Sequence, residues 1–122
     1  MEEFLIKTLL AVKATDHRKI QEEIKSRLEE QGWQVKLEKK IWAEREGKID
    51  VFAEKGGYSM GLEVDHCQIR HKSIRKLNYL KPNLAVFFMK AENINWPANR
   101  TRARQIRVNA VLIHAYKKKV ER

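Results

Sequence analysis

Three acidic side chains, Asp50, Glu63 and Asp65, lie around the pair Gly56-Gly57 in the stretch KIDVFAEKGGYSMGLEVD (48–65). The runs on either side alternate apolar and polar residues, as half-buried β-strands do. A Gly-Gly pair between such runs predicts a two-residue hairpin, because a type I′ turn needs positive φ at both central positions. The hairpin would bring carboxylates from both strands together, and paired carboxylates suit a divalent metal ion.

With the turn at the glycine pair, Asp50 faces Glu63 across the hairpin and Lys48 faces Asp65, all on one face of the sheet. Directly opposed Cβ atoms lie about 4.5–5.5 Å apart, and like charges at that separation destabilise a sheet. A bound Mg²⁺ (or Mn²⁺) would offset this repulsion. The alternative is an amphipathic hairpin with a charged, solvated outer face. In both cases the other face enters the core through Ile49, Val51, Ala53, Met60, Leu62 and Val64.

A helix is expected before the hairpin. Asp16 or Thr15 can cap a helix that runs to about Gln31, and Gly32 provides its stop. The apolar residues recur every four positions, which places them on one helical face. These residues are Ile20, Ile24 and Leu28.

The rest of the chain alternates strand and helix patterns. The expected elements are a strand at 33–42, a polar turn at 43–47, strands at 49–55 and 58–65, a helix at 66–80, a strand buried on both faces at 83–90, a loop at 93–97, a short basic helix at 98–109, a strand at 110–116 and a solvated tail at 117–122. This order predicts an α/β fold of the α+β kind, in which helices pack on one mixed sheet. We expect a single domain over 1–122.

Composition indicates a soluble protein with a polyanionic partner. The 122 residues include 26 Lys and Arg against 16 Asp and Glu, a formal net charge of +10. This balance favours nucleic acid first and an anionic membrane surface second. The one cysteine excludes an intramolecular disulfide and a multi-cysteine zinc site.

The first residues, MEEFLIKTLLAVKATD, begin with acids and carry a short apolar run broken by Lys7. This pattern is typical of neither a signal peptide nor a membrane span. We therefore expect an intracellular, cytoplasmic protein without a membrane partner, whose first residues form a helix or a strand.

The segments IQEEIKSRLEEQGWQVKLEKK and GKIDVFAEKGGYSMGLEVD, followed by a basic helix and an apolar strand, resemble the PD-(D/E)XK nuclease superfamily. The resemblance implies a restriction-endonuclease-like core: a helix, a three-strand meander, a helix and a strand. It covers about 16–90 and leaves about 91–122 as a basic C-terminal extension with a helix and a strand. The family motif is an acid on the second strand and an acid-x-lysine on the third.

The resemblance implies that Asp50 and Glu63 bind the metal ion, with the backbone carbonyl of Val64 as a further ligand. An acid on the first helix sometimes completes the site in this family. Glu22 is the matching residue, although its neighbours on both sides lie close enough to be alternatives.

The lysine of the family motif is replaced by Asp65. In the family, that lysine orients the attacking water and stabilises negative charge on the phosphate. Lys48, opposite Asp65 in the expected register, can bring an amine to nearly the same place, and Arg70 or Lys72 can reach back from the next helix. Alternatively, Asp65 binds a second metal ion, or the site binds nucleic acid without cutting it.

Arg70 lies on the apolar stripe of the expected helix at 66–80. An inward charge usually has a partner, and the acids just upstream are the natural one; the alternative is an arginine whose head reaches the rim. His17 and His114 have no evident partner.

Basic residues in the second half of the chain suit contacts with a phosphate backbone. Trp96, close to them in sequence, either stacks on an unpaired base or anchors its loop. The expected nucleic-acid-binding residues are Lys72, Arg75, Lys76, Arg100, Arg102, Arg104, Arg107, Lys117 and Lys118.

These patterns together predict a metal-dependent nuclease that hydrolyses phosphodiester bonds, in DNA before RNA. The chain leaves little room for a specificity domain, so we expect a homodimer or recruitment by a larger complex. The alternative is a catalytically inactive nucleic-acid-binding protein on the same fold. A basic RNA-binding module, for which the sequence has no recognised motif, is the third hypothesis.

Overall fold

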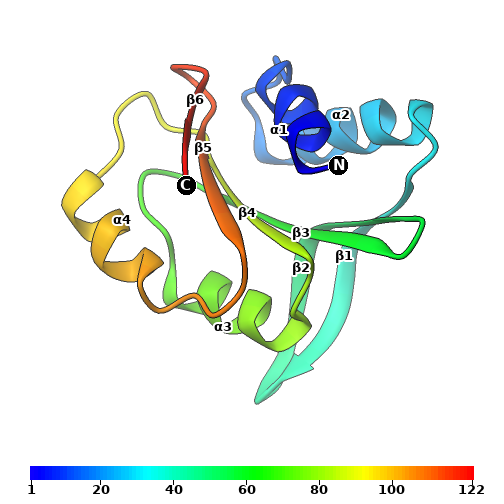
Figure 1. Cartoon of the computed structure of the whole chain (residues 1–122). Coiled ribbons are helices and arrows are strands. Elements are labelled where there is room, and N and C mark those ends of the chain that lie inside the picture. Colours follow the sequence, from blue (N-terminus) through cyan, green and yellow to red (C-terminus); the bar gives the residue numbers. More distant parts are fainter.

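The computed structural model describes residues 1–122, apart from the side chain of Ala43. Over these residues, six strands form one sheet in the order β1-β2-β3-β4-β5-β6 (Figure 1). The pairs β3–β4 and β4–β5 are parallel and the other neighbours are antiparallel, which confirms the predicted mixed sheet. The elements are α1 (Glu2–Leu10), α2 (His17–Glu30), β1 (Gln34–Ala43), β2 (Arg45–Lys55), β3 (Tyr58–Asp65), α3 (His71–Leu80), β4 (Leu84–Met89), α4 (Trp96–Ala103), β5 (Ala110–His114) and β6 (Lys119–Glu121).

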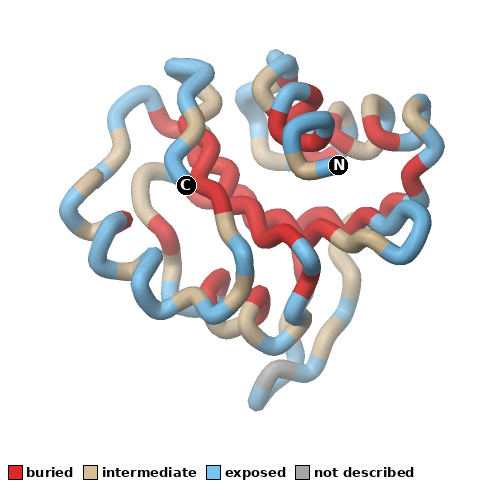
Figure 2. The backbone as a smooth tube through the Cα atoms, in the orientation of Figure 1, coloured by how far each residue is buried: buried red, intermediate tan, exposed pale blue. Residues whose placement is uncertain are grey.

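The helices cover both faces of the sheet. α1 and α2 pack on one face with residues such as Leu5, Ile24 and Val86 in a common apolar cluster. α3 and α4 lie on the other face, where Leu77 and Phe87 belong to a second cluster. The middle strands are therefore buried from both sides (Figure 2), as the continuous apolar run at 83–90 predicts.

The structure confirms the predicted α2. The side chain of Asp16 accepts a hydrogen bond from the backbone N–H of Lys19, and Gly32, with φ of 89°, follows the C-terminus of the helix. The apolar face lies against the sheet through fully buried residues. These are Ile20, Ile24 and Leu28.

The hairpin β2–β3 has the predicted turn and register. Gly56 and Gly57 have φ of 55° and 83°, and Lys55 pairs with Tyr58. The antiparallel ladder continues to the pair Val51–Leu62 and ends there. The acids therefore follow directly after the last paired residues.

Two boundaries before the site differ from the prediction. β1 reaches Ala43 and β2 begins at Arg45, so the polar turn expected at 43–47 is reduced to Glu44, whose φ is 70°. The helix expected at 66–80 begins only at His71. The reason is that side chains from elsewhere hold the segment before it: Asn99 Oδ1 accepts from the Ile69 N–H at 2.7 Å.

The C-terminal third also differs. The basic helix expected at 98–109 is α4, which starts two residues earlier because Asn95 caps it and Pro97 suits its first turn. It ends at Ala103. The tail expected to be solvated contains β6, which pairs with β5. Arg122 then forms ion pairs with Glu2 and Glu3, 2.5 Å each. Every helix in the described chain is too short or too polar to cross a membrane.

Candidate active site

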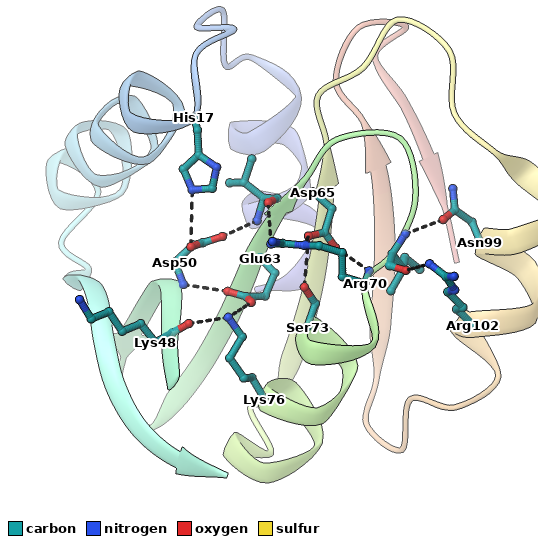
Figure 3. Close-up of polar contacts among 12 residues, drawn as sticks. His17, Lys48, Asp50, Glu63, Asp65, Arg70, Ser73, Lys76, Asn99 and Arg102 are labelled. Atoms are coloured by element: carbon teal, nitrogen blue, oxygen red, sulfur yellow. Dashed lines mark hydrogen bonds and ion pairs between the residues drawn. The ribbon is translucent and has the colours of Figure 1, made fainter. Parts of the chain in front are cut away.

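Where the β2–β3 ladder ends, the carboxylates of Asp50 and Glu63 each accept a hydrogen bond from the backbone of the opposite strand. The backbone N–H of Asp50 donates to Oε2 of Glu63 at 2.9 Å, and the backbone N–H of Val64 donates to Oδ2 of Asp50 at 2.7 Å. Each carboxylate thus accepts a bond that a carbonyl of the neighbouring strand would accept in a regular ladder. The two side chains lie between the strands (Figure 3).

This arrangement interrupts the alternation of the strand. Ile49 belongs to the apolar cluster under α3, whereas Val51 belongs to the cluster under α2, so the prediction that both lie on one face is wrong. The acids are also buried: the exposed fraction is 8% for Asp50, 0% for Glu63 and 2% for Asp65. A solvated outer face of the hairpin is thereby excluded.

Lys76 of α3 provides the positive charge nearest to this pair. Its Nζ forms an ion pair with Oε1 of Glu63 and donates to the carbonyl oxygen of Lys48 at 2.6 Å. Lys76 is itself buried. From its sequence context, Lys76 is expected only to bind nucleic acid. Its spacing from Ser73 and Leu80, three before and four after, places it on the helix face that turns toward the sheet, and this signal could have found it.

Asp65 has partners of its own. Its Oδ1 accepts from Nε of Arg70 at 2.5 Å and from the hydroxyl of Ser73 at 3.2 Å, and its Oδ2 accepts from the Arg70 backbone N–H at 3.3 Å. The predicted acidic partner of Arg70 is confirmed. The predicted place of Arg70 on a helical stripe is wrong, because Arg70 precedes the first turn of α3 as its N-cap.

Lys48 does not bring its amine to Asp65. It pairs with Lys40 of β1, and its side chain points away from Asp65 in Figure 3. The reason is that the β2–β3 ladder ends before the two residues could face each other. Of the cations proposed to replace the family lysine, Arg70 contacts Asp65 directly, and Lys72 lines the adjoining cleft.

α2 contributes His17 and Gln21 to the site. Nε2 of His17 lies 3.6 Å from Oδ1 of Asp50, and the amide of Gln21 is within 3.4 Å of the Asp50 carbonyl oxygen. Glu22, the expected metal ligand, lies on the exposed side of the helix and pairs with Arg18 at 3.5 Å. The α2 residues that reach the site are therefore His17 and Gln21, the neighbour of Glu22.

Asp50 and His17 line a cleft of about 540 Å³, which we call the basic cleft. Glu38 and Glu46 also line it, but cations outnumber acids. Such a cleft favours an anionic ligand, because its field concentrates opposite charge. The cations are Arg45, Lys48, Arg70, Lys72, Arg75 and Lys76.

Burial and charge perturb one group strongly. Burial, and next the negative charge of Asp50, raise the pKa of Glu63 to about 7, although Lys76 acts in the opposite direction. The protein offsets the closeness of the acids with Lys76 and two backbone N–H groups, so a metal ion is not needed to explain it. A cation that binds here would displace a proton near neutral pH.

Oxygen ligands for a hydrated divalent ion are present. The described residues contain no cluster of three or more His, Cys, Asp or Glu side chains that could hold a metal ion. Mg²⁺, however, commonly binds one or two carboxylates and takes its other ligands from water and phosphate. Asp50 borders the basic cleft, and the Val64 carbonyl oxygen lies 3.4 Å from the guanidinium of Arg70. With Glu63, this donor set fits Mg²⁺ or Mn²⁺.

The basic residues expected to bind nucleic acid fall into separate groups. Arg75 lines the basic cleft beside Lys72 and Lys76. Arg100, Arg104 and Arg107 are exposed on α4 and the loop after it, whereas Arg102 donates to the Ile69 carbonyl oxygen at 2.6 Å. Lys117 and Lys118 lie in the β5–β6 turn, and Lys118 donates to the Val12 carbonyl oxygen.

No family model and no curated protein matches this sequence. Among solved structures, the chain is similar to the crystal structure of AF1548, a protein of unknown function, with 14% sequence identity and a TM-score of 0.47. The match covers 88% of this chain and 57% of that one, so this chain spans a little over half the length of its structural neighbour.

Proposed function

We propose that this protein is a metal-dependent nuclease that hydrolyses phosphodiester bonds, with DNA as its substrate. The observation that carries the proposal is the buried pair Asp50 and Glu63 beside a cleft lined mainly by cations. A phosphodiester is anionic and needs both features: charge to hold the phosphate and carboxylates to hold a metal ion against it. The PD-(D/E)XK resemblance of the sequence supports the same function.

Asp50 and Glu63 would hold Mg²⁺ or Mn²⁺, together with the carbonyl oxygen of Val64. When bound, the ion polarises the scissile phosphate and lowers the pKa of a water ligand. The protein fixes the two carboxylates on adjacent strands through the bonds to the Asp50 and Val64 N–H groups. Such preorganised ligands need little rearrangement as the reaction proceeds.

Lys76 takes the role of the missing family lysine in this proposal. Its amine is next to Glu63 although it comes from α3 and not from β3. It stabilises negative charge on the phosphate, and Arg70, oriented by Asp65, is the second cation. Lys72 and Arg75 attract the neighbouring phosphates from the wall of the basic cleft.

Cleavage of supercoiled plasmid and of labelled single-stranded, duplex and branched DNA tests the proposal. Each substrate is incubated with Mg²⁺, with Mn²⁺ and with chelator. Asp50→Asn and Glu63→Gln should abolish cleavage and preserve binding in chelator. Glu54→Gln, at an exposed position of β2, is the matched control and should cleave as the wild type does. Absence of product from every substrate with both metals would overturn the proposal.

One observation favours a second function, a nucleic-acid-binding protein without catalysis. Lys76 and Arg70 already neutralise Glu63 and Asp65, so the acid cluster is compensated without a metal ion. In that case the affinity for nucleic acid would not depend on metal, and no cleavage product would form. Asp50→Asn would then leave the affinity for metal ions unchanged. A homodimer or a larger complex remains a prediction for either function, and sedimentation would measure it.

A further inference from the structure

A second concave surface lies between α4 and β5. We call it the α4 groove; its volume is about 520 Å³, which is in the range of small-molecule sites. Arg100 and Arg104 contribute cations to it. A surface that combines an apolar wall with cations suits a ligand that is flat, apolar and attached to an anion. The apolar wall consists of Ile69, Phe87, Trp96, Ile106, Val108 and Leu112.

The α4 groove adjoins the basic cleft through a third pocket. Arg104 lines both the groove and a polar pocket of about 450 Å³ between α3 and the following loop, which also contains His71 and Arg107. Arg75 lines both this polar pocket and the basic cleft. The three surfaces therefore form one basic track that crosses α3, the helix between the β1–β2 hairpin and α4 in Figure 1.

Hydrogen bonds hold the track in place. Asn78 of α3 donates to the carbonyl oxygen of Gln105 at 3.0 Å and accepts from the backbone N–H of Arg107 at 2.8 Å. Arg102 ties α4 to the segment before α3 through the Ile69 carbonyl. The arginines of the track are thus presented on a fixed backbone, which reduces the entropy lost when a ligand binds.

The charges along the track are available to a ligand. Arg100, Arg104 and Arg107 are exposed, and within the described residues they form no ion pair. Arg122, which also lines the groove, is by contrast paired with Glu2 and Glu3. The unpaired cations of the groove are therefore those on and just after α4, from which the track leads to the basic cleft.

Trp96 provides a flat aromatic surface at this end. The guanidinium carbon of Arg100 lies 5.8 Å from the centre of the Trp96 ring, a cation–π contact. The indole is half-buried and packs on the apolar cluster under α3. Aromatic rings and guanidinium planes are both surfaces on which unpaired bases stack.

We propose that the α4 groove binds an unpaired base of a DNA strand, and that Arg104 and Arg75 bind phosphates of the same strand where it runs to the basic cleft. The inference rests on the proposed function, since this strand is the flank of the substrate. A duplex keeps its bases paired and stacked, so it would meet the arginines but leave the apolar groove empty. A peptide without acidic residues would fill the groove but make no use of the line of arginines, and a second copy of this chain, with a formal net charge of +10, would be repelled by it.

Binding measured in chelator, where cleavage cannot occur, tests the inference. Fluorescence anisotropy compares a labelled single strand with a duplex of the same length over a series of salt concentrations. We expect tighter binding of the single strand. Arg75→Ala with Arg104→Ala should reduce the slope of log K against log salt by about 1.4, since each phosphate contact with single-stranded DNA contributes about 0.7. Lys7→Ala, an exposed lysine on α1, is the matched control and should change neither quantity.

Substitutions of Trp96 separate stacking from charge. Trp96→Ala should weaken binding about tenfold without changing the salt slope, because base stacking is largely independent of counterions. Trp96→Phe should retain most of the affinity. Trp96→Leu keeps an apolar side chain against the core and so guards against unfolding, which thermal melting checks. A 2-aminopurine base in the strand should be quenched on binding to the wild type and less so with Trp96→Leu.

Equal affinity for single strand and duplex, or Trp96→Leu binding as tightly as Trp96→Phe, would overturn the inference. So would a concentration-dependent oligomer that Trp96→Leu dissociates, because a second copy would then occupy the groove. These outcomes are distinct from failure of the proposed function. If substitutions in the α4 groove leave cleavage unchanged, the protein is a nuclease but the groove does not bind the substrate. If the protein binds the single strand through the groove but cleaves no substrate with either metal, the inference holds and the proposed function fails.

Discussion

The amine of Lys76 lies between two acceptors on neighbouring strands, Oε1 of Glu63 on β3 and the carbonyl oxygen of Lys48 on β2. The contact is made in a buried environment, where charges interact strongly and an unpaired charge is costly. Lys76 of α3 thereby neutralises Glu63, which in the hairpin alone would be repelled by the negative charge of Asp50. The stability of the protein and the chemistry of the site depend on the same ion pair.

Removal of the amine should destabilise the fold. Lys76→Met leaves Glu63 buried without its cation, and breaking a buried ion pair in this way costs about 3–5 kcal/mol. The free energy of unfolding from urea titration at pH 8, in chelator, measures the loss. Lys72→Met, at an exposed position of the same helix, should change it by less than about 0.5 kcal/mol. Equal effects of the two variants would show that the ion pair does not contribute.

Protonation of Glu63 should stabilise the folded state of the metal-free protein over a defined range of pH. The folded pKa of Glu63 is about 7, above the ordinary value of 4.5, so the folded state binds more protons than the unfolded state between these values. Stability from this group is complete below pH 4.5 and is lost as pH rises through about 7, by roughly 3 kcal/mol. The difference in unfolding free energy between wild type and Glu63→Gln, followed from pH 4.5 to 8, measures it. A difference that does not vary with pH would contradict the prediction.

Divalent ions should stabilise the protein, and more so at pH 8 than at pH 5. The reason is that a metal ion and a proton compete for Glu63, and the proton occupies it at low pH. At a concentration one hundred times the dissociation constant, Mg²⁺ or Mn²⁺ should add about 2.7 kcal/mol. Thermal melting with and without metal provides the measurement. Glu54→Gln should retain the shift, while Asp50→Asn should lose it; an equal shift in both would place the ion elsewhere.

A methyl group at Gly61 should disturb the docking of α3. A Cβ atom there would lie 2.8 Å from Cδ2 of Leu80 and 3.0 Å from Cδ2 of Leu77, closer than side chains tolerate. Gly61→Ala should therefore cost about 1–3 kcal/mol by overpacking, and it should lower cleavage by displacing Lys76. Leu80→Ala in the same chain removes one of the clashing atoms and should recover part of the loss. Double-mutant analysis of unfolding tests this coupling.

Local sequence determines much of the hairpin and of α2. Gly56-Gly57 specifies a turn that fixes the pairing from Lys55 to Val51, and Asp16 and Gly32 define the ends of a helix. These features depend on neighbours in the chain, so a pattern of a few residues contains the necessary information.

The cation partners of the acids depend on contacts that no local pattern contains. The pairing of β2 with β3 ends at Val51 and Leu62, because beyond this pair the carboxylates of Asp50 and Glu63 accept the backbone hydrogen bonds. α3 begins at His71 because Asn99, thirty residues from Ile69, holds the preceding segment. Because the ladder has ended, Lys48 does not face Asp65, and the cation that meets Glu63 is Lys76 of α3. The metal ion, the substrate and the catalysis remain predictions that the experiments above address.

The order in which the site assembles follows from the connection between β3 and β4. β2 and β3 are neighbours across a two-residue turn, whereas Lys76 belongs to the crossover that must dock before the parallel pair β3–β4 is complete. During folding, pairing of nearby segments usually precedes contacts with a large loop-closure cost. The β2–β3 hairpin should therefore bring Asp50 and Glu63 together before Lys76 reaches them. Because the repulsion between the two carboxyl groups grows as they ionise, the rate of refolding should fall as the pH of the solvent rises.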